Sequence, residues 1–129
     1  MTKTASRIGE INLVMIPSTD QDRSIEFYEG ALGFEKRTDI PFGGDYRWVE
    51  VYPPSGTTGI ALAPPREGES GGVQTGISLT TDDIDATHAQ LKSSGVDVDA
   101  EVSRMGDPVP PMFWFRDPDG HTLMVVEVS

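Results

Sequence analysis

The sequence carries two copies of one pattern of expected elements, and this internal repeat constrains the fold more than any other feature. Asp20 and Asp83 each precede a helix-like segment and lie 63 residues apart, while Gly33 and Gly95 each end that segment and lie 62 residues apart. Asp is favoured at helix N-termini and Gly at helix C-termini, so both copies have the same start and stop signals. Two copies at so long a period favour duplicated modules that pack together or exchange with a second chain, rather than a solenoid.

Apolar and β-branched runs predict four strands in each copy. Those of the first copy are residues 8–17, 34–40, 46–52 and 58–63, and those of the second are 73–80, 96–102, 112–116 and 121–128. Turn-favouring runs of Pro, Gly, Ser and Asp separate them. Residues 64–72 are linker-like. The sequence therefore predicts two β-α-β-β-β modules, 8–63 and 73–128, in a single domain spanning 1–129.

The charge balance excludes several kinds of partner. The 129-residue chain has 10 Lys and Arg against 21 Asp and Glu, a net charge of −11, so its field repels phosphate backbones and anionic membranes. We expect no nucleic-acid or membrane partner and a cytoplasmic location, since no run approaches the roughly 20 apolar residues of a membrane span. The lack of Cys excludes disulfides, thiolate metal sites and Cys nucleophiles.

Short motifs stand at matching places in the two modules. In the first module they are Asp20, Phe27-Tyr28 and Leu32-Gly33-Phe34. In the second they are Asp82-Asp83-Ile84-Asp85, Gly95-Val96 and Asp117-Pro118-Asp119-Gly120-His121. Their order and spacing resemble those of the vicinal oxygen chelate superfamily, which includes glyoxalase I, bleomycin-resistance proteins and extradiol dioxygenases. The resemblance covers nearly the whole chain and implies an α+β fold whose eight strands form an open cup-shaped sheet, with helices outside, around a small ligand.

Most of these motif residues have structural roles. Asp20 and Asp83 are expected to cap helices. Phe27 and Tyr28 fall on the apolar stripe of the first helix, so we expect them in the core. The run from Asp117 to Gly120 has the composition of a tight hairpin turn closed by glycine. These residues identify the fold and carry no chemistry.

Metal-dependent members of that superfamily place His, Gln or Glu on the first strand, and Glu on the last strand, of each module. Carried over residue by residue, these four places hold Leu13, Ala61, Gly76 and Met124. None of them offers a hard divalent ion an oxygen or nitrogen ligand. We therefore expect no metal site and no cofactor, and Glu50 is the best remaining candidate for a carboxylate inside the cup.

The two histidines do not suggest an active site. His88 lies on the apolar stripe of the second helix, where we expect it to pack. His121 follows a turn glycine, and we expect it to be exposed. Neither has another histidine near it, so the sequence assembles no histidine metal site and no Ser-His-Asp triad.

The last hairpin predicts the lining of the cup. If Asp117 pairs with His121, then Trp114 faces Met124 and Arg116 faces Thr122. The alternate residues, Phe113, Phe115, Leu123 and Val125, then lie under a helix. The residues expected to bind the ligand are Trp114, Arg116, Met124, Leu13, Met15, Met112, Thr122, Trp48 and Glu50.

This lining suits a planar or hydrophobic organic molecule, with Arg116 available for an anionic group. Trp48 could face either the cup or a helix, and the sequence does not decide between them. Because side chains alternate along a strand, Tyr46 and Glu50 face the same way as Trp48.

The functional expectation is a metal-free protein that binds a small apolar or aromatic molecule and sequesters it, as the bleomycin-resistance branch does. One alternative is a glyoxalase- or dioxygenase-type enzyme that holds a divalent metal through atypical ligands or moves a proton with Glu50 or His88. Another is an interaction module with a vestigial cup. We expect a homodimer, with module pairing within or between chains left open.

Overall fold

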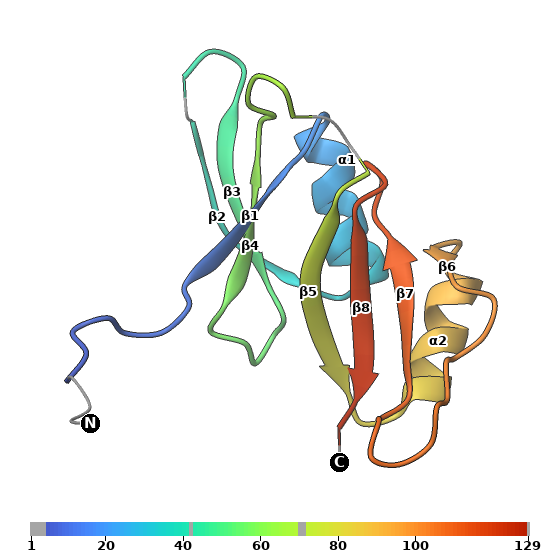
Figure 1. Ribbon diagram of the computed structural model, residues 1–129. Coiled ribbons are helices and arrows are strands. Elements are labelled where there is room, and N and C mark those ends of the chain that lie inside the picture. The colour runs from blue at the N-terminus through green and yellow to red at the C-terminus, as the bar shows by residue number, and fades with distance from the viewer. Residues whose placement is uncertain (1–4, 42, 70–71, 129) are drawn as a thin grey trace.

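The structure is a computed structural model that describes residues 5–41, 43–69 and 72–128 (Figure 1). The first module contains β1 (Leu13–Pro17), α1 (Gln21–Glu26), the π-helical turn η1 (Phe27–Ala31), β2 (Glu35–Pro41), β3 (Arg47–Tyr52) and β4 (Gly59–Ala63). The second contains β5 (Gln74–Thr81), α2 (Ile84–Ser93), β6 (Asp97–Val98), β7 (Met112–Arg116) and β8 (Thr122–Glu127). In the described part of the chain, no helix is long and apolar enough to cross a membrane.

The predicted α+β class and the two tandem modules are confirmed. The eight strands form two open four-stranded sheets, ordered β1-β4-β3-β2 and β5-β8-β7-β6. In each sheet the first and last strands of the module pair in parallel, and the other pairs are antiparallel. The repeat seen in the sequence is therefore a repeat of strand order as well.

Two strands are shorter than predicted by several residues. The expected strand 8–17 begins only at Leu13, and residues 5–12 form an exposed arm that leaves the body of the molecule (Figure 1). The expected strand 96–102 is reduced to the two residues of β6. After Val98, the Asp99 side chain rather than a backbone carbonyl accepts the next N–H of β7, that of Trp114, at 3.1 Å.

The predicted helix caps are confirmed. The Asp20 carboxylate accepts the Arg23 N–H at 3.1 Å, and the Asp83 carboxylate accepts the Ala86 N–H at 3.0 Å. Glu127, at the end of β8, accepts the Ile84 N–H at 2.9 Å and ties α2 to its own sheet.

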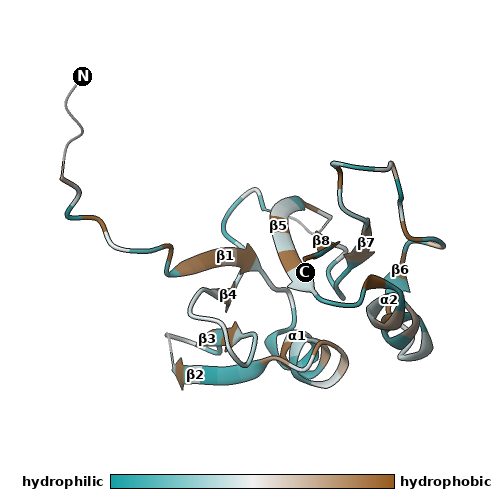
Figure 2. Cartoon of the chain, turned by 90° about the horizontal axis from the view of Figure 1, so that it is seen from below, coloured by the Kyte–Doolittle hydropathy of each residue, from teal (hydrophilic) through white to brown (hydrophobic). Residues whose placement is uncertain are grey.

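Both helices lie on the inner faces of the sheets. Seen from below, α1 lies in the angle between the two sheets and α2 lies beside it under the second (Figure 2). The inner face of the first sheet buries Val49, Val51, Ile60 and Leu62, and that of the second buries Phe113, Phe115, Leu123 and Val125, as the hairpin register predicts. One continuous core joins these faces to Tyr28, Ile84 and Leu91 from the helices.

The prediction that His121 is exposed is wrong, because its side chain is fully buried at the junction of the modules. Its Nε2 lies 2.7 Å from the Pro17 carbonyl, and its Nδ1 accepts the Val73 N–H at 3.2 Å. A carbonyl only accepts, so Nε2 carries the proton. The turn from Asp117 to Gly120 directs the ring inward, toward the end of β1.

Candidate functional site

Each sheet leaves one face free of helices, and these two faces are built alike. On the first, Ala61 lies between Met15 on β1 and Glu50 on β3. On the second, Met124 lies between Ser78 on β5 and Trp114 on β7. We use the name first open face for the face that carries Leu13, Met15, Trp48, Glu50, Tyr52 and Ala61. The second open face carries Gly76, Ser78, Met112, Trp114, Arg116, Thr122 and Met124.

The two open faces of one chain point in different directions. The sheets meet at an angle with the helices inside it, so both open faces lie on the outside of that angle (Figures 1 and 2). Met15 and Trp114, both expected in one cup, therefore lie on separate faces.

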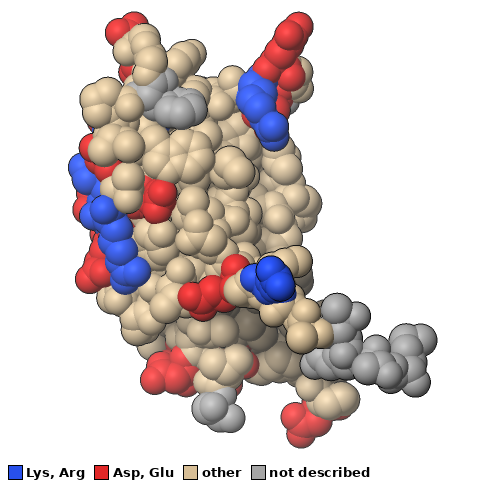
Figure 3. Space-filling view, turned by 90° about the vertical axis from the view of Figure 1, so that its left-hand side faces the viewer, with Lys and Arg blue, Asp and Glu red and all other residues tan. Residues whose placement is uncertain are grey.

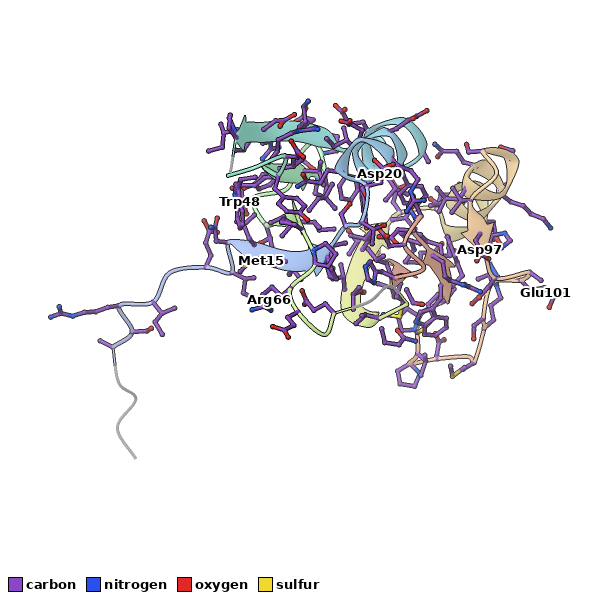
Figure 4. All side chains as sticks on the ribbon, turned by 90° about the horizontal axis from the view of Figure 1, so that it is seen from above. Met15, Asp20, Trp48, Arg66, Asp97 and Glu101 are labelled. Atoms are coloured by element: carbon purple, nitrogen blue, oxygen red, sulfur yellow. The ribbon has the colours of Figure 1, made fainter. Side chains whose placement is uncertain are left out.

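The first open face contains a hollow of about 320 Å³. Its lining consists of Met15, Pro17, Tyr46, Trp48, Ala63, Pro64, Pro65, Arg66 and Glu69. Met15 is 64% exposed and Tyr46 is 54% exposed, so large apolar surface faces solvent. Figure 3 shows the uncharged centre of this side with charged residues toward its rim, and Figure 4 shows Met15, Trp48 and Arg66 at one end of the molecule.

The Glu50 carboxylate is the polar centre of the first open face. It accepts the Trp48 Nε1–H at 2.7 Å on one oxygen and the Tyr52 hydroxyl at 2.7 Å on the other. The hydrogen bond to Glu50 raises the pKa of the Tyr52 phenol above its ordinary value. Gly59 provides the space for the Tyr52 ring, because a Cβ there would lie 2.6 Å from a ring carbon.

The second open face has a smaller hollow of about 80 Å³. It is lined by Gln74, Gly76, Ile77, Trp114, Thr122 and Met124. Arg116 continues this face, but Asp99 binds its guanidinium at 2.8 Å and Asp97 lies 3.7 Å from it. Two carboxylates therefore already compensate the charge that the sequence offered to an anionic ligand.

The structure thus divides the predicted ligand-binding residues into two groups. Trp48, Glu50, Leu13 and Met15 share the first face, which answers the open question about Trp48. The other five share the second face: Trp114, Arg116, Met124, Met112 and Thr122.

Sequence reasoning did not identify Pro64, Pro65 and Arg66, which belong to the linker but line the first hollow. Their position could have identified them, because they directly follow β4, which pairs with β1 and ends beside Pro17.

The four places where metal-dependent relatives hold ligands do not fit a metal ion. Ala61 has Met15 and Glu50 as neighbours, and Met124 has Ser78 and Trp114. Thioethers, a methyl group and one hydroxyl give a divalent ion no charged ligand set, and Glu50 is the one carboxylate among these neighbours. Across the described residues, no group of three His, Asp or Glu side chains could hold a metal ion.

His88 lies away from both open faces. Its Nε2 is 2.7 Å from the Asp99 carbonyl oxygen, and its ring meets Phe113 edge to face at 5.0 Å. Phe113 is on the inner face of the second sheet, so His88 packs on the helix side as the sequence predicts. This position removes it as a proton-transfer group for a ligand in the cup.

The sequence profile of the Glyoxalase/Bleomycin resistance protein/Dioxygenase superfamily matches residues 10–125. The chain belongs to this superfamily. A crystal structure of another member, from Sphaerobacter thermophilus, is 35% identical, has a TM-score of 0.86, and the match covers 94% of this chain and 98% of that one.

Two further proteins are also similar to this chain. The antibiotic-binding protein TnmS3 from Streptomyces sp. is 30% identical with a TM-score of 0.84, over 97% of this chain and 100% of its own. The Bacillus subtilis protein YurT is 30% identical over 118 residues, which are 84% of this chain and 91% of YurT.

Proposed function

We propose that this superfamily member binds a small aromatic organic molecule, without a metal ion, and sequesters it. The observation that carries the proposal is the hollow on the first open face, where Trp48 and the exposed Met15 offer a flat, apolar and adaptable surface. Similarity to TnmS3, an antibiotic-binding protein, supports the same kind of activity. Sequestration needs a shaped apolar site and no reactive group.

We further propose that two copies of the chain complete each binding cup. A hollow open to solvent on one side covers one surface of a planar molecule, whereas ligand sites usually enclose most of it. The first open face of one copy can lie against the second open face of another, since the two faces have the same strand order. A two-fold axis then generates two identical cups, and in each of them the Met15 of one copy is covered by the other copy.

An enzymatic alternative rests on Glu50. It is the remaining candidate for moving a proton in the cup, because His88 lies on the helix side. Both Glu50 oxygens already accept hydrogen bonds from Trp48 and Tyr52, an arrangement that favours a fixed carboxylate over a proton shuttle. Binding is therefore the better supported function.

Tryptophan fluorescence tests the binding proposal, because Trp48 and Trp114 are the two tryptophans and lie on different faces. Acridine, a planar aromatic that accepts tryptophan excitation energy, is titrated into the Trp48→Phe and Trp114→Phe variants. A shared cup predicts that both remaining tryptophans are quenched with the same midpoint. Quenching of Trp48 alone would reject the two-copy cup, and quenching of neither would reject the aromatic site.

A further inference from the structure

Glu50 carries a charge that the described part of the protein does not balance. Its oxygens bind the Trp48 indole N–H and the Tyr52 hydroxyl, both neutral donors, and it forms no ion pair with a described Lys or Arg. A carboxylate has about four acceptor positions, so these two bonds leave further ones. Glu50 is also only half-buried, at the centre of an otherwise apolar face. A ligand can therefore reach it.

Aromatic residues lie before and after Glu50 along β3. Tyr46 and Trp48 line the neighbouring hollow, and Tyr52 lies on the other side of the carboxylate. The Arg37 guanidinium already sits over the Tyr52 ring, 4.4 Å from its centre. Aromatic faces combined with a counter-charge are the composition that binds ammonium groups in proteins.

The positive charges on both open faces are already engaged. Arg66, at the rim of the first hollow, lies 3.6 Å from Glu69. Arg116, on the second face, is held by Asp99 and Asp97. An anionic ligand would meet arginines that already lie beside carboxylates. A cationic ligand would meet Glu50, which has no such ion pair among the described residues.

We propose that Glu50 determines ligand specificity by binding a positively charged nitrogen, so that the preferred ligand is a planar aromatic amine in its protonated form. The inference rests on the proposed function, since it requires that an aromatic molecule occupies the cup. In this arrangement the aromatic rings of the ligand lie against Trp48 and Met15. The cationic nitrogen donates to a free acceptor position of Glu50, beside Trp48 and Tyr52.

Three probes with one ring system test this inference at neutral pH. They are 9-aminoacridine, which is a cation, acridine, which is neutral, and acridine-9-carboxylate, which is an anion. A charge-assisted hydrogen bond predicts that 9-aminoacridine binds about tenfold more tightly than acridine, and that the carboxylate binds more weakly than both. Added salt weakens the binding of 9-aminoacridine more than that of acridine.

The variant Glu50→Gln keeps the size of the side chain and removes its charge. It is expected to remove the tenfold preference, so that 9-aminoacridine and acridine bind this variant with about equal affinity. The matched control is Glu29→Gln, which removes the same charge from an exposed residue of η1 on the helix side and keeps the preference.

The outcomes separate the inference from the proposed function. If the wild-type protein binds acridine and 9-aminoacridine equally, or if Glu50→Gln keeps the preference, the specificity role of Glu50 is overturned while aromatic binding stands. If the wild-type protein binds none of the three probes, the proposed function itself fails. The wild-type comparison and its salt dependence do not depend on the folding of any variant.

Discussion

The Tyr28 hydroxyl donates a 3.0 Å hydrogen bond to the Asp117 carboxylate, and this contact joins the helical segment of the first module to the final turn of the second. The other Asp117 oxygen accepts the N–H groups of Asp119 and His121 at 3.0 and 2.9 Å. Both Tyr28 and Asp117 are buried, so the bond is protected from competing water. Together with the shared core and the His121–Pro17 contact, it holds the two modules against each other.

The substitution Tyr28→Phe is expected to lower the free energy of unfolding by about 1–3 kcal/mol, because it leaves a buried Asp117 oxygen without its donor. Urea denaturation measures the change. Asp117→Asn combined with Tyr28→Phe gives a double-mutant cycle, in which a coupling energy near zero would contradict the assigned bond.

The same residue predicts how stability depends on alkaline pH. Burial, and then the neighbouring Asp117 charge, raise the pKa of Tyr28 well above its ordinary value of 10.0. The folded state therefore holds this proton more tightly than the unfolded state, so the stabilisation is complete below the unfolded pKa and is lost as pH rises above it. The free energy of unfolding should fall above pH 10.0, and Tyr28→Phe should make this fall shallower. An equally steep fall in Tyr28→Phe would contradict the prediction, and Tyr46→Phe, at an exposed tyrosine, is the control.

His121→Ala is expected to destabilise the protein by about 3 kcal/mol, because it opens a cavity and leaves two backbone groups unpaired. These groups are the Pro17 carbonyl and the Val73 N–H. His121→Gln offers a donor and an acceptor and should recover part of the loss. Thermal and urea unfolding compare the two variants, and equal stabilities would show that the ring's hydrogen bonds contribute little.

The sequence predicts those features of the fold that depend on neighbouring residues. The caps at Asp20 and Asp83 and the hairpin that places Trp114 opposite Met124 follow from local backbone chemistry. Counting along the hairpin was therefore sufficient to assign Phe113 to the core.

Features that depend on distant contacts could not be predicted in this way. The burial of His121 depends on Pro17, 104 residues earlier in the chain. The engagement of Arg116 depends on Asp99, in a segment that the sequence assigned to a regular strand. The separation of the open faces depends on how the modules pack, and neither module's pattern contains that information.

Elemental analysis tests the expectation that the protein binds no metal ion. The residues at the family's ligand positions are Leu13, Ala61, Gly76 and Met124, and they supply no oxygen or nitrogen side-chain ligand. Protein purified without chelators should contain well under one equivalent of Ni, Zn, Fe or Mn per chain, and EDTA should leave acridine binding unchanged. A full equivalent of bound metal, or loss of binding in EDTA, would restore the enzymatic alternative.

Met15→Glu tests whether a second copy covers the first open face. Met15 is 64% exposed in one chain, so a carboxylate there is solvated in the monomer and harms neither the core nor the sheet. In the proposed dimer the second open face of the other copy covers the same carboxylate. The cations near it, Arg66 and Arg116, already lie beside carboxylates of their own, so burial of the added charge costs several kcal/mol. Sedimentation equilibrium should therefore find the mass of two chains for the wild-type protein and a dissociation constant raised at least about tenfold for Met15→Glu.

The matched control is Met105→Glu, at a methionine that is 66% exposed and belongs to neither open face. It adds the same charge and should leave the association unchanged, while circular dichroism confirms that both variants fold. If the proposed two-copy cup forms, Met15→Glu should also weaken acridine binding at protein concentrations where the wild type is dimeric. A wild-type monomer that binds acridine with full affinity would show instead that a single open face is sufficient.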